Sequence, residues 1–82
     1  MNLKLISPVP NLNKTISGVS WLEVDTPIGN FVILQEHAPT ILILKENSFA
    51  RYGLQTGKQA QIQIAQGLLY VKKDSLTILL NE

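Results

Sequence analysis

The stretch QAQIQIA at residues 59–65 decides the fold class. Ala60, Ile62 and Ile64 alternate with three glutamines, and successive side chains of an extended chain point to opposite faces. The alternation therefore predicts a strand with one face in a core and the other face in water. Residues 75–80, SLTILL, repeat the pattern with Leu76, Ile78 and Leu80 on one side, although Leu79 on the other side is apolar too.

The rest of the chain has the composition of a sheet protein. Its 82 residues include five Val, nine Ile and five Thr but only four Ala, and β-branched side chains favour pleated sheet. Five Gly and four Pro are spread so that short strands fit between them. Seven further strands are predicted, at 3–6, 15–17, 20–25, 30–34, 40–44, 48–52 and 68–71. The sequence predicts one all-β domain over residues 1–82, either a two-layer sandwich or a small barrel.

Two features leave the direction of apolar side chains open. Segments 31–34, 41–44 and 68–71 are apolar on both faces, so either both faces are covered internally or one meets a partner. Trp21 points outward as an interface anchor if Leu22 and Val24 face the core. A β-bulge would instead place Trp21 in the core.

The residues of most catalytic and metal sites are missing. The chain has no Cys and one His, which excludes disulfides, thiol nucleophiles and Cys-ligated zinc. A catalytic His37 would need a nucleophile and an acid such as Ser48, Ser75 or Asp25 placed beside it by the tertiary fold. A turn or interface role for His37 is the favoured interpretation. With no glycine-rich phosphate loop either, the sequence predicts a protein without catalytic, metal or cofactor sites.

Charge and hydropathy limit the classes of partner that the chain could bind. Seven Lys and Arg against six Asp and Glu leave no basic surplus for a phosphate backbone. A small nucleic-acid-binding barrel stays an alternative, centred on Arg51, Lys72 and Lys73. The apolar runs are four residues long, far short of the roughly 20 that a membrane helix needs, and no secretory signal opens the chain. Membrane association is therefore expected only through a partner.

The segment GNFVILQEHAPT at residues 29–40 resembles the G-x-hydrophobic-G-I-L-P-G-H-A-P-L segment of the epsilon subunit of rotary ATP synthases. Residues 15–18, TISG, are similar to that family's F-S-G turn. Residues 67–71 followed by 76–79 are similar to its G-G-x-L-E-V…V-T-V-L ending. The order and approximate spacing hold along nearly the whole chain.

The resemblance implies a ten-stranded β-sandwich, the N-terminal domain of epsilon. That domain grips the foot of the gamma subunit and rests on the membrane rotor ring of a proton- or sodium-translocating complex. It couples rotation to ATP synthesis or hydrolysis without chemistry of its own, without a cofactor and with one copy per complex. The implied location is the cytoplasmic face of the cell membrane, or its organellar equivalent. By position, the rotor ring would contact Pro27, Ile28, Gly29 and Asn30, and gamma would contact Glu36, His37, Ala38, Pro39 and Trp21.

The chain also departs from the family pattern. Gln35-Glu36 and Glu46-Asn47 stand where the family has Pro-Gly, so these turns must be rebuilt, and Asn30 replaces a common acidic residue. The sequence ends at Glu82, where the family continues into a two-helix hairpin. The resemblance therefore implies a minimal epsilon that lacks the helical region for inhibition. The alternative is a stand-alone adaptor of the same fold that binds another stalk or coiled-coil protein.

Overall fold

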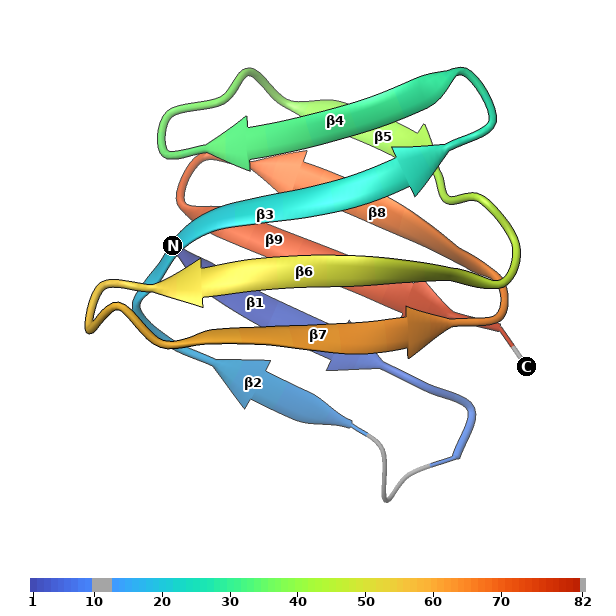
Figure 1. The fold of residues 1–82 in the computed structure, drawn as a ribbon, viewed down its shortest axis with the longest axis horizontal. Coiled ribbons are helices and arrows are strands. Elements are labelled where there is room, and N and C mark those ends of the chain that lie inside the picture. Colours follow the sequence, from blue (N-terminus) through green and yellow to red (C-terminus); the bar gives the residue numbers. More distant parts are fainter. Residues whose placement is uncertain (10–12, 82) are drawn as a thin grey trace.

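A computed structural model of the protein describes residues 1–9 and 13–81, so Glu82, with which the sequence ends, lies outside the described residues. The described residues form nine strands and no helix (Figure 1). Each strand begins and ends within two residues of the predicted range. In chain order they are β1 (Asn2–Ile6), β2 (Lys14–Ile16), β3 (Val19–Thr26), β4 (Gly29–Leu34), β5 (Thr40–Ile43), β6 (Ser48–Leu54), β7 (Gln59–Ile64), β8 (Gly67–Lys72) and β9 (Ser75–Leu80). No helix that could span a membrane occurs in the described part of the chain.

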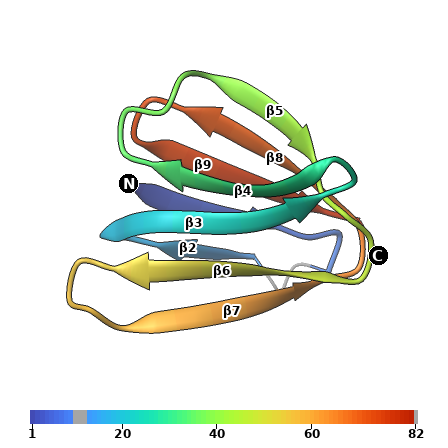
Figure 2. The same cartoon turned by 45° about the horizontal axis from the view of Figure 1, so that its top comes forward.

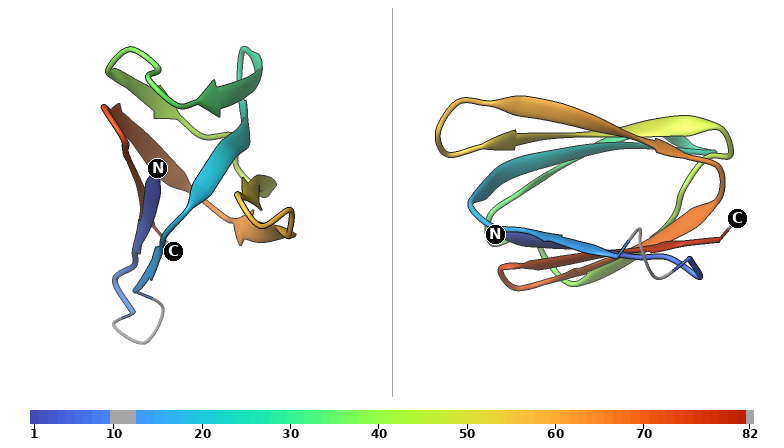
Figure 3. Two further views of the ribbon diagram at one scale, coloured as in Figure 1. Left: turned by 90° about the vertical axis from the view of Figure 1, so that its left-hand side faces the viewer. Right: turned by 90° about the horizontal axis from the view of Figure 1, so that it is seen from below.

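The strands form two stacked sheets. One sheet has five strands in the order β2-β1-β9-β8-β5, and the other has four in the order β4-β3-β6-β7. All pairings are antiparallel except that of β1 with β9, which joins the two ends of the chain in parallel. The two layers are separate when the molecule is seen edge-on (Figure 3, right). The sandwich is therefore confirmed over the barrel.

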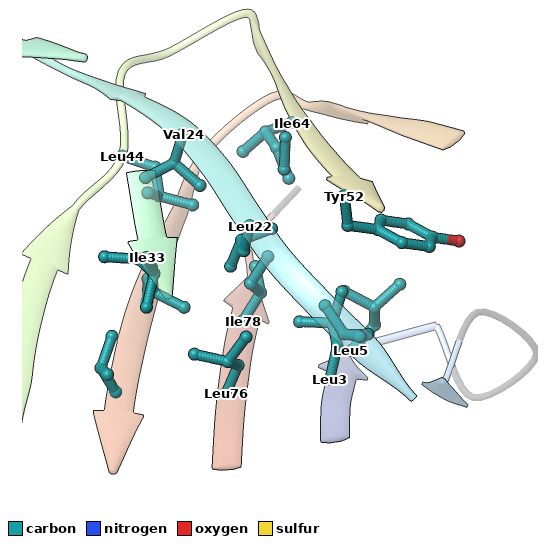
Figure 4. Close-up of a cluster of buried hydrophobic side chains, with 14 residues drawn as sticks. Leu3, Leu5, Leu22, Val24, Ile33, Leu44, Tyr52, Ile64, Leu76 and Ile78 are labelled. Atoms are coloured by element: carbon teal, nitrogen blue, oxygen red, sulfur yellow. The ribbon is translucent and has the colours of Figure 1, made fainter. Parts of the chain in front are cut away.

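The core lies between the two sheets and is built from alternate residues of the strands. Leu22 and Ile33 from the four-stranded sheet lie over Leu76 and Ile78 from the five-stranded sheet (Figure 4). All four are completely buried. The inward positions of β9 are confirmed for Leu76 and Ile78. In β7 the prediction is confirmed only at the end of the strand, where Ile64 is buried, because Ile62 is half-buried and Ala60 is exposed like the glutamines.

Two rebuilt turns place non-glycine residues in the left-handed region. Glu36 has φ 67° and Asn47 has φ 54°, and both occupy the position where the resembling family has glycine. Glycine adopts this conformation without the steric penalty that a Cβ brings. Ser48 supports the second turn, because its Oγ donates a hydrogen bond to the carbonyl oxygen of Lys45 at 2.6 Å. The backbone shape of these turns is thus reached without Pro-Gly.

Trp21 lies outside the core, and the hypothesis that a bulge buries it is wrong. A bulge does occur between Val19 and Trp21, but it adds its extra residue before Trp21. Val19 and Leu22 therefore both point inward, and the half-buried Trp21 takes the outer face between them. Its indole lies over Gly53 on the neighbouring strand, where a Cβ would collide with the ring.

Candidate partner-binding surface

Exposed apolar side chains gather on one side of the sandwich. Of the eight large hydrophobic side chains that are exposed in the described chain, five lie between residues 28 and 43. This segment contains β4 and β5, which are edge strands of opposite sheets and lie along the same side of the molecule (Figures 1 and 2). We call this the β4–β5 side, and its exposed apolar residues are Ile28, Val32, Leu34, Ile41 and Ile43.

The turn between β3 and β4 forms one end of this side. Buried Thr26 fixes the turn from below, because its Oγ1 donates to the carbonyl oxygen of Gly29 at 2.9 Å and accepts from the backbone N–H of Ile28 at 3.2 Å. Asn30 Nδ2 donates to Asp25 Oδ1 at 2.9 Å. The turn therefore holds Ile28 outward, where its side chain is 86% exposed.

The loop between β4 and β5 forms the opposite end. The backbone N–H of His37 donates to the carbonyl oxygen of Leu34 at 3.2 Å, which closes a turn with Glu36 in its left-handed position. The ring Nδ1 of His37 lies 2.8 Å from the carbonyl oxygen of Ala38. His37 is half-buried, and Glu36, Ala38 and Pro39 are exposed.

The predicted contact residues therefore fall into two groups at opposite ends of β4. Trp21 belongs with the loop group, because it lies directly opposite Leu34 in the β3–β4 register, and Leu34 leads into the loop. Residues 27–30 lie at the start of β4 (Figure 1). Val32 and Leu34 lie on β4 between the two groups, and the sequence analysis did not predict either as a contact residue. The sequence did contain a sign of them, because segment 31–34 is apolar on both faces.

The basic residues do not form one patch. Arg51 lies on the outer face of the four-stranded sheet, where its Nη1 is 3.6 Å from Oε1 of Glu23. Lys72 and Lys73 lie at the end of β8 in the other sheet. The three side chains proposed for a nucleic-acid site are therefore divided between two sheets, which disfavours that alternative.

Clustered metal ligands are likewise not found where the structure describes the chain. Within residues 1–9 and 13–81, no three His, Asp or Glu side chains gather to hold a metal ion. The β4–β5 side instead exposes apolar side chains between two turns. Such an arrangement suits protein recognition through a hydrophobic centre with a polar rim.

The sequence matches the family model of the β-sandwich domain of the ATP synthase delta/epsilon chain, over residues 1–82. The chain belongs to this family. No curated protein matches the sequence of this delta/epsilon-type chain. Its membership agrees with the resemblance carried by residues 29–40 and with the sandwich of two sheets.

Solved structures share the fold of this delta/epsilon-type sandwich. A chain of the Tetrahymena thermophila mitochondrial ATP synthase, from a cryo-EM structure of the central stalk and c-ring, superposes with a TM-score of 0.77 at 13% identity. A chain of the Euglena gracilis mitochondrial ATP synthase, from a structure of OSCP, F1 and c-ring, superposes with a TM-score of 0.82 at 21% identity. The alignments cover 100% and 98% of this chain, and 63% and 49% of the neighbours' chains.

Proposed function

We propose that this chain is the β-sandwich of a central-stalk subunit in a membrane-associated rotary ATP synthase, acting as one domain over residues 1–82 and in one copy per complex. Its role is to couple rotation without catalysing a reaction. The observation that carries the proposal is the family match along the whole chain. The mitochondrial ATP synthase chains of the same fold add support.

We assign the two ends of the β4–β5 side to different partners. The turn at residues 27–30 contacts the rotor ring, and the loop at residues 36–39, with Trp21, contacts the gamma subunit. The separation of the two groups supports this assignment, since five residue steps of β4 hold them roughly 17 Å apart at about 3.4 Å a step. A strand that holds the two contacts at a fixed separation transmits torque from one partner to the other.

Photo-crosslinking tests the assignment. A photoreactive amino acid replaces Ile28 in one variant and His37 in another, and each tagged chain is expressed in its source cell and recovered from gently solubilised membranes. We expect the first variant to crosslink a rotor-ring subunit and the second to crosslink gamma, as identified by mass spectrometry. A matched control with the photoreactive residue at exposed Gln61, on the far edge of the four-stranded sheet, should crosslink neither.

The same recovery decides between the stalk subunit and the adaptor of the same fold. A gamma-like subunit recovered together with catalytic-head and rotor-ring subunits supports the proposal. Recovery of a different coiled-coil or stalk protein without any rotary subunit overturns it in favour of the adaptor.

A further inference from the structure

The two sheets of the sandwich are unequal on the side opposite to the β4–β5 side. There β2 is the edge of the five-stranded sheet and β7 is the edge of the four-stranded sheet, and β2 projects past β7 (Figures 1 and 3, left). The buried Leu3 and Leu5 lie opposite Ile16 and Lys14, and opposite residues share a face. Ile16 and Lys14 therefore lie on the inner face of β2, yet Ile16 is only half-buried and Lys14 is exposed.

The backbone of β7 is open toward this side. The N–H of Leu54 donates to the carbonyl oxygen of Lys58 at 2.8 Å, so these residues form a hydrogen-bonded pair at the start of the β6–β7 ladder. Hydrogen-bonded and non-hydrogen-bonded pairs alternate along an antiparallel ladder, and the register continues without a shift along β7. Gln59, Gln61 and Gln63 therefore direct their N–H and C=O groups away from β6, toward the open edge.

The strand β7 also lacks the features that block pairing at an edge. Many edge strands carry a lysine, a proline or a bulge that prevents another strand from adding. β7, with the sequence QAQIQI, has no charged residue, no proline and no shift of register. On its inner face Ile62 is half-buried and Ala60 is exposed, so apolar surface continues from the core to the edge.

We propose that an extended segment of another polypeptide adds to β7 as a fifth strand of the four-stranded sheet. Its backbone pairs with the three outward-facing glutamines, its inward apolar side chains cover Ile16, and a carboxylate faces Lys14. Main-chain hydrogen bonds supply affinity in this mode of binding, and alternate side chains supply specificity. A hollow of about 420 Å³, lined in part by Leu5, Asn13 and Lys14, offers space for a side chain at one end. The edge lies opposite the β4–β5 side, so the inference does not depend on the proposed function.

The charge of Lys14 is available to this strand. The strands β1, β2 and β7 contain no Asp and no Glu. The acidic side chains of two other turns bind other groups, because Asp74 Oδ1 accepts from Gln35 at 3.4 Å and Glu46 Oε1 accepts from Gln66 at 3.3 Å. A partner strand with Glu or Asp at its inward position near Lys14 gains attraction that a strand with Lys does not.

The shape of the edge favours a single segment over a second copy of the chain. Pairing of β7 with β7 of a second copy would turn the two β2 strands toward each other, and each of them projects past β7 (Figures 1 and 3, left). Lys14 of one copy would then approach Lys14 of the other. A single extended segment has no second sheet, and it lies over the inner face of β2 without this conflict.

A displayed peptide library tests the proposal. The library consists of linear peptides of about nine residues with Val at alternate inward positions, Thr between them, and Glu, Lys or Ala varied at the first and last inward positions. It is panned against the purified protein. We expect enrichment of Glu over Lys at one end, and we expect the variant Lys14→Glu to select Lys there instead. The absence of any enriched peptide, or equal enrichment of Glu and Lys, overturns the proposal.

Amide hydrogen exchange of the protein with a selected peptide tests strand addition itself. We expect the peptide to slow exchange at Gln59, Gln61 and Gln63, whereas Ala60 and Ile62 are already protected by β6 in the free protein. The variant Gln61→Pro removes one outward N–H and leaves the ladder with β6 intact, as proline at an edge does, and should weaken binding at least about tenfold. Gln61→Thr is the matched control, because it changes the same side chain and keeps the N–H, and it should bind normally. Circular dichroism shows that both variants are folded.

Methylated peptides give the same test on the unaltered protein, should Gln61→Pro not fold. N-methylation of one alternating set of peptide amides should abolish binding, and N-methylation of the other set should be tolerated. Equal effects of the two sets, protection that does not alternate along β7, or normal binding by folded Gln61→Pro overturns the proposal. A concentration-dependent dimer in sedimentation that Gln61→Pro abolishes assigns the edge to a second copy and overturns it as well.

Discussion

At the scale of single residues, Gly53 and Trp21 form one unit. The indole occupies the space above Gly53 that a side chain would fill. We expect Gly53→Ala to displace the ring and to lower the free energy of unfolding by about 1–3 kcal/mol, as overpacking does elsewhere. Urea unfolding measures the loss, and because the chain has one Trp, its fluorescence emission reports the displaced indole directly.

The control for Gly53→Ala is the double variant Trp21→Ala/Gly53→Ala, followed by circular dichroism. If the ring is the cause, the second substitution costs little once the indole is gone, and the double-mutant cycle shows a large coupling. An equal cost in both backgrounds would show that Gly53 is needed for another reason.

Glu36 is a second residue whose position favours a particular amino acid, because its backbone conformation is one that glycine adopts more easily. Its φ of 67° is penalised by the Cβ, so Glu36→Gly should raise the free energy of unfolding by about 1 kcal/mol. Thermal unfolding measures the change. Gln35→Gly is the matched control: Gln35 has no positive φ, and added freedom of the unfolded chain should cost about 0.5–1 kcal/mol. A gain in Gln35→Gly as large as in Glu36→Gly would contradict the explanation.

The side chains of β3 show how much the sequence could predict about single residues. The inward positions of Leu22 and Val24 follow from alternation and are confirmed. Whether Trp21 points inward or outward depends on where the bulge adds its extra residue. The sequence pattern allows either direction, because two residues separate Val19 from Leu22. In the structure the indole of Trp21 lies in the space above Gly53, on the outer face. Gly53 is beside Trp21 because β6 pairs with β3, and no local sequence pattern specifies that pairing.

At the scale of the element, β4 places a buried and an exposed apolar side chain in adjacent positions. Ile33 is completely buried, whereas Val32 is 51% exposed. We expect Ile33→Thr to cost about 2–5 kcal/mol, because it removes buried carbon atoms and buries a hydroxyl. Val32→Thr keeps the β-branch on the outer face and should cost about 0.5 kcal/mol or less. Urea unfolding of both variants gives the comparison, and similar losses would show that the β4–β5 side is packed against something in the free protein.

All nine strands were predicted because each is short, alternating or β-branched and bounded by Gly, Pro or a polar turn. The segments that are apolar on both faces predicted less about which side chains are buried. In segment 68–71 the residues Leu69 and Val71 are buried and their neighbours are half-buried, whereas Ile41 and Ile43 are mostly exposed. Both segments are apolar on both faces, and their burial differs because β8 is an inner strand and β5 is an edge strand.

At the scale of the whole molecule, the order of the strands joins distant parts of the chain. The parallel pair of β1 with β9 brings residues 2–6 against residues 75–79. Local alternation fixes which residues face the core but not which strands are neighbours, so this pairing was not predicted from the residues. The pairing also joins β2 to the rest of the five-stranded sheet, because β1 lies between β2 and β9.

Removing β1 should therefore unfold the domain rather than trim it. Leu3 and Leu5 are both buried, and burying two leucines stabilises the fold by about 3–6 kcal/mol, which is comparable to the 5–15 kcal/mol that holds a typical domain. Without β1, β2 also loses the only strand that pairs with it in the described chain. We expect residues 7–82 to show no cooperative thermal transition by circular dichroism. A synthetic peptide of residues 1–9, added in excess, should restore the transition, whereas the same peptide with Leu3→Asp and Leu5→Asp should not. A cooperative transition of residues 7–82 alone would show that the remaining eight strands close the core without β1.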